Sequence, residues 1–154
     1  MKYKPTTTSA IAFAQAERLE EWLHLFLCNE GGNREFLDGL KLEPRIYAAP
    51  RLMDLNLFAR CCGPEEDLKW TIPAAPFHAN VDAIAKKYKT GKWDMPPLII
   101  NELDGRYELN DGNHRFEALR KLGVEQYWVI IWKTDFDEIA SVAGCTAGSD
   151  TPRL

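Results

Sequence analysis

Residues 110–115 read Asn-Asp-Gly-Asn-His-Arg, and they place a carboxylate, two amides, an imidazole and a guanidinium within one short turn. A strand-like run over residues 106–109 precedes this turn, and a helix-like run over residues 116–122 follows it at once. The first N–H groups of a helix have no partner inside it, and the helix dipole makes that end positive. Such an end attracts phosphate, so the turn predicts an anion-binding site.

The side chains of this turn suggest separate roles. His114 and Arg115 can donate charge-assisted hydrogen bonds to an anion, while Asp111 could hold a metal ion or accept a proton. Gly112 permits unusual backbone angles, and Asn113 could cap the helix. The structural alternative is a capped helix that merely begins with His and Arg. The functional interpretation is favoured because cations in a first turn oppose the dipole, and a bound anion would compensate for that cost.

Composition limits the class of protein. The chain has 154 residues and a net charge of −4, which predicts one domain and argues against a broad nucleic-acid surface. No apolar run has the length of a membrane span and no signal peptide is apparent, so we expect a cytoplasmic protein. The cysteines lack zinc-site spacing and are expected to be reduced and mostly buried: Cys28, Cys61, Cys62 and Cys145. The P-loop, the Gly-x-Gly-x-x-Gly fingerprint and the Gly-x-Ser-x-Gly elbow are absent from the sequence.

The first half of the chain carries mainly helical patterns. Apolar residues at helical spacing predict an amphipathic helix over residues 9–28, docked on the core through Ala12, Ala16, Leu19, Trp22, Leu23 and Phe26. After a break at residues 29–33, we expect a short helix at 34–40, an extended piece at 45–49 and a short helix at 52–60. The acidic run Glu65-Glu66-Asp67 fits a helix N-terminus, or alternatively a source of one catalytic or metal-binding carboxylate.

The second half alternates strands and helices. Its expected elements are a strand at 69–72, a helix at 81–89 capped by Asn80, a buried strand at 97–101, a return strand at 106–109, a helix at 113–122 and a last core strand at 127–132. Asp104-Gly105 predicts the hairpin turn, and Gly123 the end of the helix. A short helix is expected to start at Thr134 or Asp135, and residues 147–154 are expected to form a loose tail.

The block from Pro96-Pro97-Leu98-Ile99-Ile100 through Tyr107-Glu108-Leu109-Asn110-Asp111-Gly112-Asn113-His114-Arg115 to Leu122-Gly123 resembles the ParB/sulfiredoxin superfamily, in its Asp-Gly-x-His-Arg subgroup. The resemblance covers residues 68–133. It implies an α+β fold, a small mixed β-sheet with flanking helices. The implied organisation is a helical N-terminal extension at 1–67 packed on the core, a ParB/sulfiredoxin-like domain at 68–146 and the tail at 147–154.

In this superfamily the turn is a nucleotide phosphate site: ParB proteins bind CTP, whereas sulfiredoxins and free serine kinases use ATP. The resemblance therefore implies a nucleoside triphosphate, ATP or CTP, with Mg²⁺. Gly112, Asn113, His114 and Arg115 would contact its phosphates. Asp111 and His114 would be catalytic, and Asp111 would also hold the metal. The second acid of the kinases would come from Glu65 or Glu66.

Two departures from the family pattern narrow the function. Asn113 occupies the place of the sulfiredoxin cysteine, so that nucleophile is missing. Only 31 residues follow Gly123, and they begin with a strand rather than a DNA-reading helix. We expect a Mg²⁺-dependent NTPase or phosphotransferase acting on a small-molecule or protein acceptor. The alternatives are a non-catalytic nucleotide-sensing or protein-interaction module, and a ParB-like DNA-associated protein or nuclease. DNA is the partner that the acidic composition disfavours most, and no membrane partner is expected.

Overall fold

The computed structural model describes residues 1–142. Three helices, α1 (Thr7–Gln15), α2 (Leu19–Cys28) and α3 (Arg34–Leu40), precede β1 (Arg45–Tyr47), β2 (Arg51–Asp54), the 3-10 helix η1 (Leu55–Leu57) and β3 (Ala59–Arg60). The chain continues with β4 (Cys62–Gly63), β5 (Trp70–Thr71), α4 (Ala74–Lys89), β6 (Leu98–Leu103), β7 (Arg106–Asp111), α5 (Asn113–Lys121) and β8 (Gln126–Thr134). The predicted tail at 147–154 lies outside the described residues.

Strands β6, β7 and β8 form the centre of a mixed six-stranded sheet, with the order β1-β8-β6-β7-β3 and with β2 also paired to β8. β6 runs parallel to β8 and antiparallel to β7. β4 and β5 form a separate two-stranded sheet. The α+β class predicted from the sequence is confirmed. The segment 1–67 supplies three strands of the main sheet in addition to its helices.

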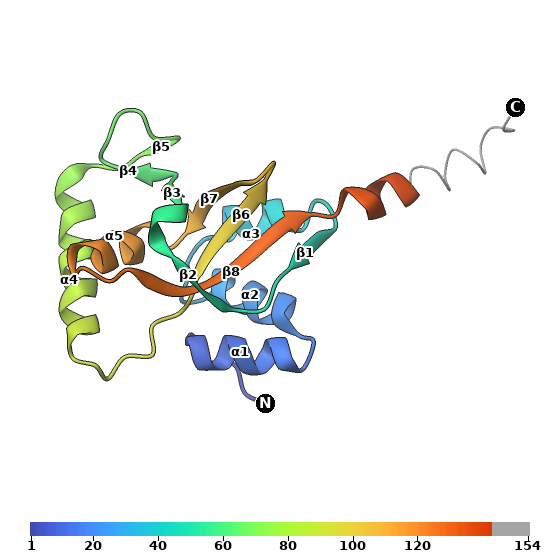
Figure 1. Cartoon of the computed structure of the whole chain (residues 1–154), viewed down its shortest axis with the longest axis horizontal. Coiled ribbons are helices and arrows are strands. Elements are labelled where there is room, and N and C mark those ends of the chain that lie inside the picture. Colours follow the sequence, from blue (N-terminus) through green and yellow to red (C-terminus); the bar gives the residue numbers. More distant parts are fainter. Residues whose placement is uncertain (143–154) are drawn as a thin grey trace, which may run out of the picture.

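Helices cover both faces of this sheet (Figure 1). On one face α1, α2 and α3 pack on Ile99, Ile130 and Trp132, which explains the apolar stripes of these helices. On the other face α5 packs on Leu98, Ile100 and Leu109, and α4 lies outside α5. Successive residues of β6 are fully buried because both faces of the strand are covered, as the apolar run at 98–100 predicted.

The predicted helix over 9–28 is in fact two helices, so that prediction is wrong about continuity. Glu17 adopts a left-handed conformation (φ 58°) between α1 and α2. The N–H of Arg18 donates back to the carbonyl of Phe13 (2.8 Å), which ends α1. Ala16 is exposed, whereas Phe13 and Trp22 are buried. The expected docking on the core is confirmed for Leu19, Trp22, Leu23 and Phe26 but not for Ala12 or Ala16, and the break lets both helices present their apolar side to the sheet.

Two further predictions in the first half are wrong. Residues 52–60, expected as a helix, form β2, η1 and β3, because β2 pairs with β8 and β3 pairs with β7. This long-range pairing overrides the local helical spacing. The acidic run at 65–67 forms the turn between β4 and β5 and does not begin a helix. The short helix at 34–40 and the extended segment after residue 45 are confirmed.

The second half follows the prediction closely, with strand ends shifted by one or two residues and one helix boundary shifted further. α4 begins at Ala74, not at Val81, and its N-cap is Pro73 instead of Asn80. Pro76 is tolerated there because the first N–H groups of a helix need no helical partner. The hairpin turn at Asp104-Gly105 is confirmed, with φ of 53° and 76°, and β8 is the predicted last strand of the core. Asp135 accepts a hydrogen bond from the N–H of Glu138 (3.1 Å) as the predicted helix starts.

No helix among the described residues has both the length and the apolar character needed to cross a membrane.

Candidate functional site

The turn between β7 and α5 follows an irregularity in the sheet. Ile99 of β6 pairs with Asp111 of β7, but Ile100 pairs with Leu109, so Asn110 is an extra residue on β7. Such a bulge redirects the side chains that follow it, and bulges concentrate near functional sites. Asp111, which ends β7, is therefore turned toward the loop that joins α2 and α3 and is 7% exposed.

The backbone and the surroundings of position 112 favour glycine over any residue with a side chain. Its φ is 101°, in the left-handed region. A Cβ atom built there would lie 2.8 Å from Leu98 Cδ2 and 2.9 Å from Arg115 Nη2. Gly112 is also the N-cap of α5, so the prediction that Asn113 caps this helix is wrong; Asn113 is its first residue.

The N-terminus of α5 keeps its positive character. Its N-cap makes no side-chain hydrogen bond, and its first turn contains no acidic residue. The first helical hydrogen bond runs from the N–H of Phe116 to the carbonyl of Gly112 (2.8 Å). The amides before Phe116 precede that bond, so the helix end can still donate to an anion.

Asp111 is held by two donors from different parts of the chain. Asn33 Nδ2 donates to Asp111 Oδ1 (3.1 Å), and Arg115 Nη2 lies 3.4 Å from Asp111 Oδ2. Asn33 is the N-cap of α3. The N-terminal segment therefore fixes the carboxylate that the resemblance marks as catalytic and metal-binding.

Arg115 is packed more firmly than a surface arginine. Its side chain is 13% exposed, and Nη2 donates to the carbonyl of Pro97 (3.0 Å). Its guanidinium lies over the ring of Phe26, 5.5 Å from the ring centroid, which is within the reach of about 6 Å for a cation–π contact. Arg115 Nε is buried without a hydrogen-bond partner among the described residues. An unpaired buried donor of a charged group is costly, so a ligand oxygen near it would be stabilising.

His114 stands beside the aromatic ring of Phe77 from α4, with 4.9 Å between the ring centroids. Burial lowers the pKa of His114 below its ordinary value, and the charge of Arg115 lowers it further, while Asp111 acts in the opposite direction. The ligand-free imidazole is therefore mostly neutral at neutral pH. A bound phosphate would raise this pKa, because a nearby anion favours the protonated ring.

These residues line one hollow of about 270 Å³ between the start of α5 and the side of α4; we call it the α5 hollow. Its walls are Gly31, Asn80, Ala83, Ile84, Asp111, Gly112, His114 and Arg115. A second hollow of about 270 Å³ shares Ile84 and Arg115 with it and also contains Glu30, Lys87 and Trp93. Asp111, Gly112, His114 and Arg115 are thus together, as the sequence predicted.

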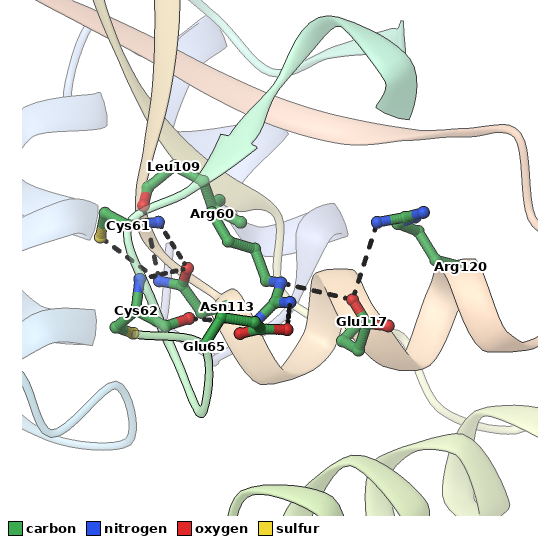
Figure 2. A network of polar contacts seen from close by, with 8 residues as sticks. All are labelled: Arg60, Cys61, Cys62, Glu65, Leu109, Asn113, Glu117 and Arg120. Carbon is green, nitrogen blue, oxygen red and sulfur yellow. Dashed lines mark hydrogen bonds and ion pairs between the residues drawn. The ribbon is translucent and has the colours of Figure 1, made fainter. Parts of the chain in front are cut away.

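Asn113 differs from its neighbours in the turn, because its side chain is 4% exposed and lies away from the hollow. Figure 2 shows its amide oxygen accepting hydrogen bonds from the N–H groups of Cys61 (3.1 Å) and Cys62 (3.3 Å). Its Nδ2 donates to the carbonyl of Leu109 (3.4 Å). Only the backbone of Asn113 is left for a phosphate.

The two acids suggested as partners of Asp111 lie elsewhere. Glu65 pairs with Arg60 (2.5 Å), which also contacts Glu117 (3.3 Å; Figure 2). Neither Glu65 nor Glu66 lines the α5 hollow. Among residues 1–142 there is no group of three or more His, Cys, Asp or Glu side chains that could hold a metal ion. The role of a second acid therefore has no geometric support.

Several residues of the site carried no local signal. Gly31 and Asn33 belonged to a stretch that indicated only the end of a helix, and Asn80 was expected as a cap. Gly31 and Asn80 line the α5 hollow, and Asn33 contacts Asp111 from outside it, because the N-terminal helices and α4 fold against the ends of β6 and β7. A polar Asn next to two glycines after a helix is the one cue that could have drawn attention to that loop.

No protein-family model and no curated protein matches the chain. Solved structures that resemble it include sulfiredoxin from Arabidopsis thaliana, at 19% identity and a TM-score of 0.42, covering 61% of this chain and 96% of that one. A free serine kinase in complex with AMP matches at 16% identity and a TM-score of 0.43, over 58% of this chain and 33% of that one. A Pnob8-like ParB-N domain matches at 17% identity and a TM-score of 0.44, over 66% of this chain and 36% of that one.

These neighbours are of the ParB/sulfiredoxin-like fold that the motif at 96–123 suggested, at low sequence identity. The chain spans about a third of the length of the kinase and ParB-type structures. With TM-scores below 0.5, the likeness adds nothing about which ligand this chain binds.

Proposed function

We propose that this protein binds a nucleoside triphosphate, with its phosphates in the α5 hollow. The observation that carries the proposal is the convergence of Gly112, His114 and Arg115 on one hollow at an uncapped helix N-terminus without a first-turn acid. Backbone amides and the helix dipole favour an anion there. The guanidinium of Arg115, which lines the same hollow and contacts Asp111 Oδ2, adds positive charge beside these amides.

The adjoining hollow gives the ligand room beyond its phosphates. It shares Ile84 and Arg115 with the α5 hollow, so the two are contiguous along α4. The nucleoside would lie toward Trp93, whose ring is contacted by the ammonium group of Lys87 at 4.2 Å from the centroid. Lys87 can also approach the phosphates, because a lysine side chain is long and flexible.

A Mg²⁺ ion would enter with the nucleotide. Asp111 is the one carboxylate in the lining of the α5 hollow, and Mg²⁺ typically takes one or two carboxylates together with phosphate oxygens and water. The residues present therefore fit a metal held mainly by the substrate. The ion would neutralise phosphate charge, while His114 and the α5 amides orient the transferred group.

Two activities remain consistent with this site. A phosphotransferase or NTPase would use Asp111 to hold the metal or to accept a proton. A nucleotide sensor without turnover is favoured by the two donors already bound to Asp111 and by the absence of a second acid from the hollow. Hydrolysis therefore decides between them.

The test is a calorimetric titration of the full chain with ATP, CTP and GTP, with and without Mg²⁺, combined with a phosphate-release assay. His114→Gln should weaken binding about tenfold to a hundredfold, since a hydrogen bond to a charged group contributes roughly 1.5–3 kcal/mol. His78→Gln is the matched control, because His78 is exposed on α4 and outside the hollow. Equal affinity of both variants, or no binding by the wild-type chain, would refute the proposal.

Asp111→Asn separates the two activities. The amide keeps an oxygen that can accept from Asn33 but removes the negative charge. An enzyme should lose phosphate release and keep nucleotide affinity within about tenfold, whereas a sensor has no phosphate release to lose. Asp82→Asn is the control, because Asp82 is exposed on α4 and pairs only with Lys121 in the described part of the chain.

A further inference from the structure

A pocket separate from these two hollows is lined in part by residues of β7, and we call it the thiol pocket. Its volume is about 410 Å³. It is lined by Asn33, Glu35, Phe36, Cys61, Cys62, Lys69, Trp70, Ile72, Glu108 and Asn110, none of which lines the α5 hollow. Its distinguishing chemistry is the pair of adjacent cysteines, which nothing in the proposed nucleotide site uses.

The backbone of the two cysteines is held in place by a single buried side chain. Asn113 Oδ1 accepts from the N–H groups of both Cys61 and Cys62 (Figure 2). The carbonyl of Cys61 accepts from the N–H of Trp70 (2.9 Å), which ties the pair to β5. Asn113 Nδ2 also contacts Cys61 Sγ at 3.7 Å. Both cysteines therefore belong to a fixed wall of the pocket.

The thiols are poor nucleophiles as they stand. Burial raises the pKa of Cys61, and burial together with the neighbouring Cys61 thiol raises the pKa of Cys62 to about 11. Both groups are therefore protonated at neutral pH, and reagents that attack a single thiolate should react slowly. A ligand whose oxygen leaves as water, together with both thiol protons, can bind the protonated thiols directly.

We propose that Cys61 and Cys62 together form a chelating site for a trivalent thiophilic metalloid, of the arsenite and organoarsenical class. With an arsenical R–As=O, two S–As bonds form, the As=O bond breaks, and the oxygen leaves as water with the two thiol protons. The oxidation states of arsenic and sulfur do not change. Soft sulfur ligands favour soft partners, and the second bond is intramolecular, so it forms at a high effective concentration.

The probe is phenylarsine oxide, added in slight excess to the reduced full-length protein and followed by intact-mass spectrometry after desalting. We expect one arsenical per chain, bound with the loss of one water. Cys28→Ser should bind equally, because Cys28 is exposed and does not line the thiol pocket. Cys61→Ser and Cys62→Ser should each abolish retention, since only one of the two paired thiols then remains in the pocket and one thiol cannot chelate.

Two measurements keep the test decisive. If Cys61→Ser fails to fold because Cys61 is buried, Cys62→Ser carries the result, since Cys62 is only half-buried. A small dithiol should remove the arsenical from the wild-type chain, and a monothiol should not. Retention by both Cys61→Ser and Cys62→Ser, retention only when Cys28 is present, or no adduct on the wild-type chain would overturn the proposal. The readout does not involve a nucleotide, so a failed nucleotide titration leaves it unaffected.

Discussion

The replacement of Asn113 by Ala tests whether one buried amide joins the cysteine segment to the start of α5. Asn113 is 4% exposed, and its oxygen is the acceptor for the N–H groups of Cys61 and Cys62. Alanine removes this acceptor and leaves both donors unpaired. An unsatisfied buried donor costs about 1–3 kcal/mol, and the half-buried Cys62 amide, which water can reach, belongs at the lower end. The expected loss of unfolding free energy is therefore about 2–4 kcal/mol.

This loss can be measured by urea denaturation followed through tryptophan fluorescence. In thermal denaturation of a chain of this length, each kcal/mol of lost unfolding free energy lowers Tm by roughly 2–4 °C, so the Tm of Asn113→Ala should fall by about 5–15 °C. Because the Cys61 segment is released, alkylation of Cys61 and Cys62 by a maleimide should also become faster. That acceleration would separate a local release from a general loss of stability.

Asn29→Ala is the matched control. Asn29 also donates from its side chain, to the carbonyl of Leu25 (2.8 Å), but this contact is exposed and water can replace it. The loss of unfolding free energy in Asn29→Ala should stay within about 0.5 kcal/mol. The reasoning is refuted if Asn113→Ala destabilises the chain by no more than Asn29→Ala, or if the maleimide reactivity of the two cysteines is unchanged.

Two further predictions concern the α5 hollow. Gly112→Ala should destabilise the fold by about 2–4 kcal/mol in urea denaturation, because the positive φ costs about 1–2 kcal/mol and the new Cβ also meets Leu98 and Arg115. The control is Gly123→Ala, with φ 75° and no atom within 4 Å of the new Cβ, which should show only the cost of the positive φ. Equal losses of stability in the two variants would count against the steric clash at Gly112. The pKa of His114 is lowered in the ligand-free protein, and a bound phosphate should raise it. Nucleotide affinity should therefore increase as the pH falls through the His114 pKa of the complex, and it should level off below the His114 pKa of the ligand-free protein. The total gain in affinity should be tenfold for each unit that separates these two pKa values. Calorimetry on the wild type and His114→Gln across this range checks the effect, which a parallel pH dependence of the two proteins would exclude.

Much of the second half of the fold could be predicted because its signals are local. The apolar run of β6, the Asp104-Gly105 turn and Gly123 after α5 each act within a few residues. The core of the candidate site was predictable for the same reason, because Gly112, His114 and Arg115 follow one another at a strand-to-helix turn.

The misses arise where distant segments decide the outcome. Residues 52–60 have helical spacing, yet β2 and β3 form because β8 and β7 offer unpaired edges. The expected helix at 9–28 breaks at Glu17 so that both halves can reach one apolar sheet face. In each case the burial and hydrogen bonds gained across the fold outweigh a weak local preference.

The order of residues along the chain was enough to predict the hairpin of β6 and β7 and the strand-to-helix turn that follows it, because turn chemistry and side-chain period are properties of neighbours, whereas the mixed sheet was implied by the resemblance of residues 68–133. Three-dimensional folding alone placed Asn33 on Asp111, 78 positions away, and set Asn113 against Cys61 and Cys62. Those contacts depend on strand pairing and on the bulge at Asn110, which are settled by the packing of the whole sheet and leave no trace in local spacing.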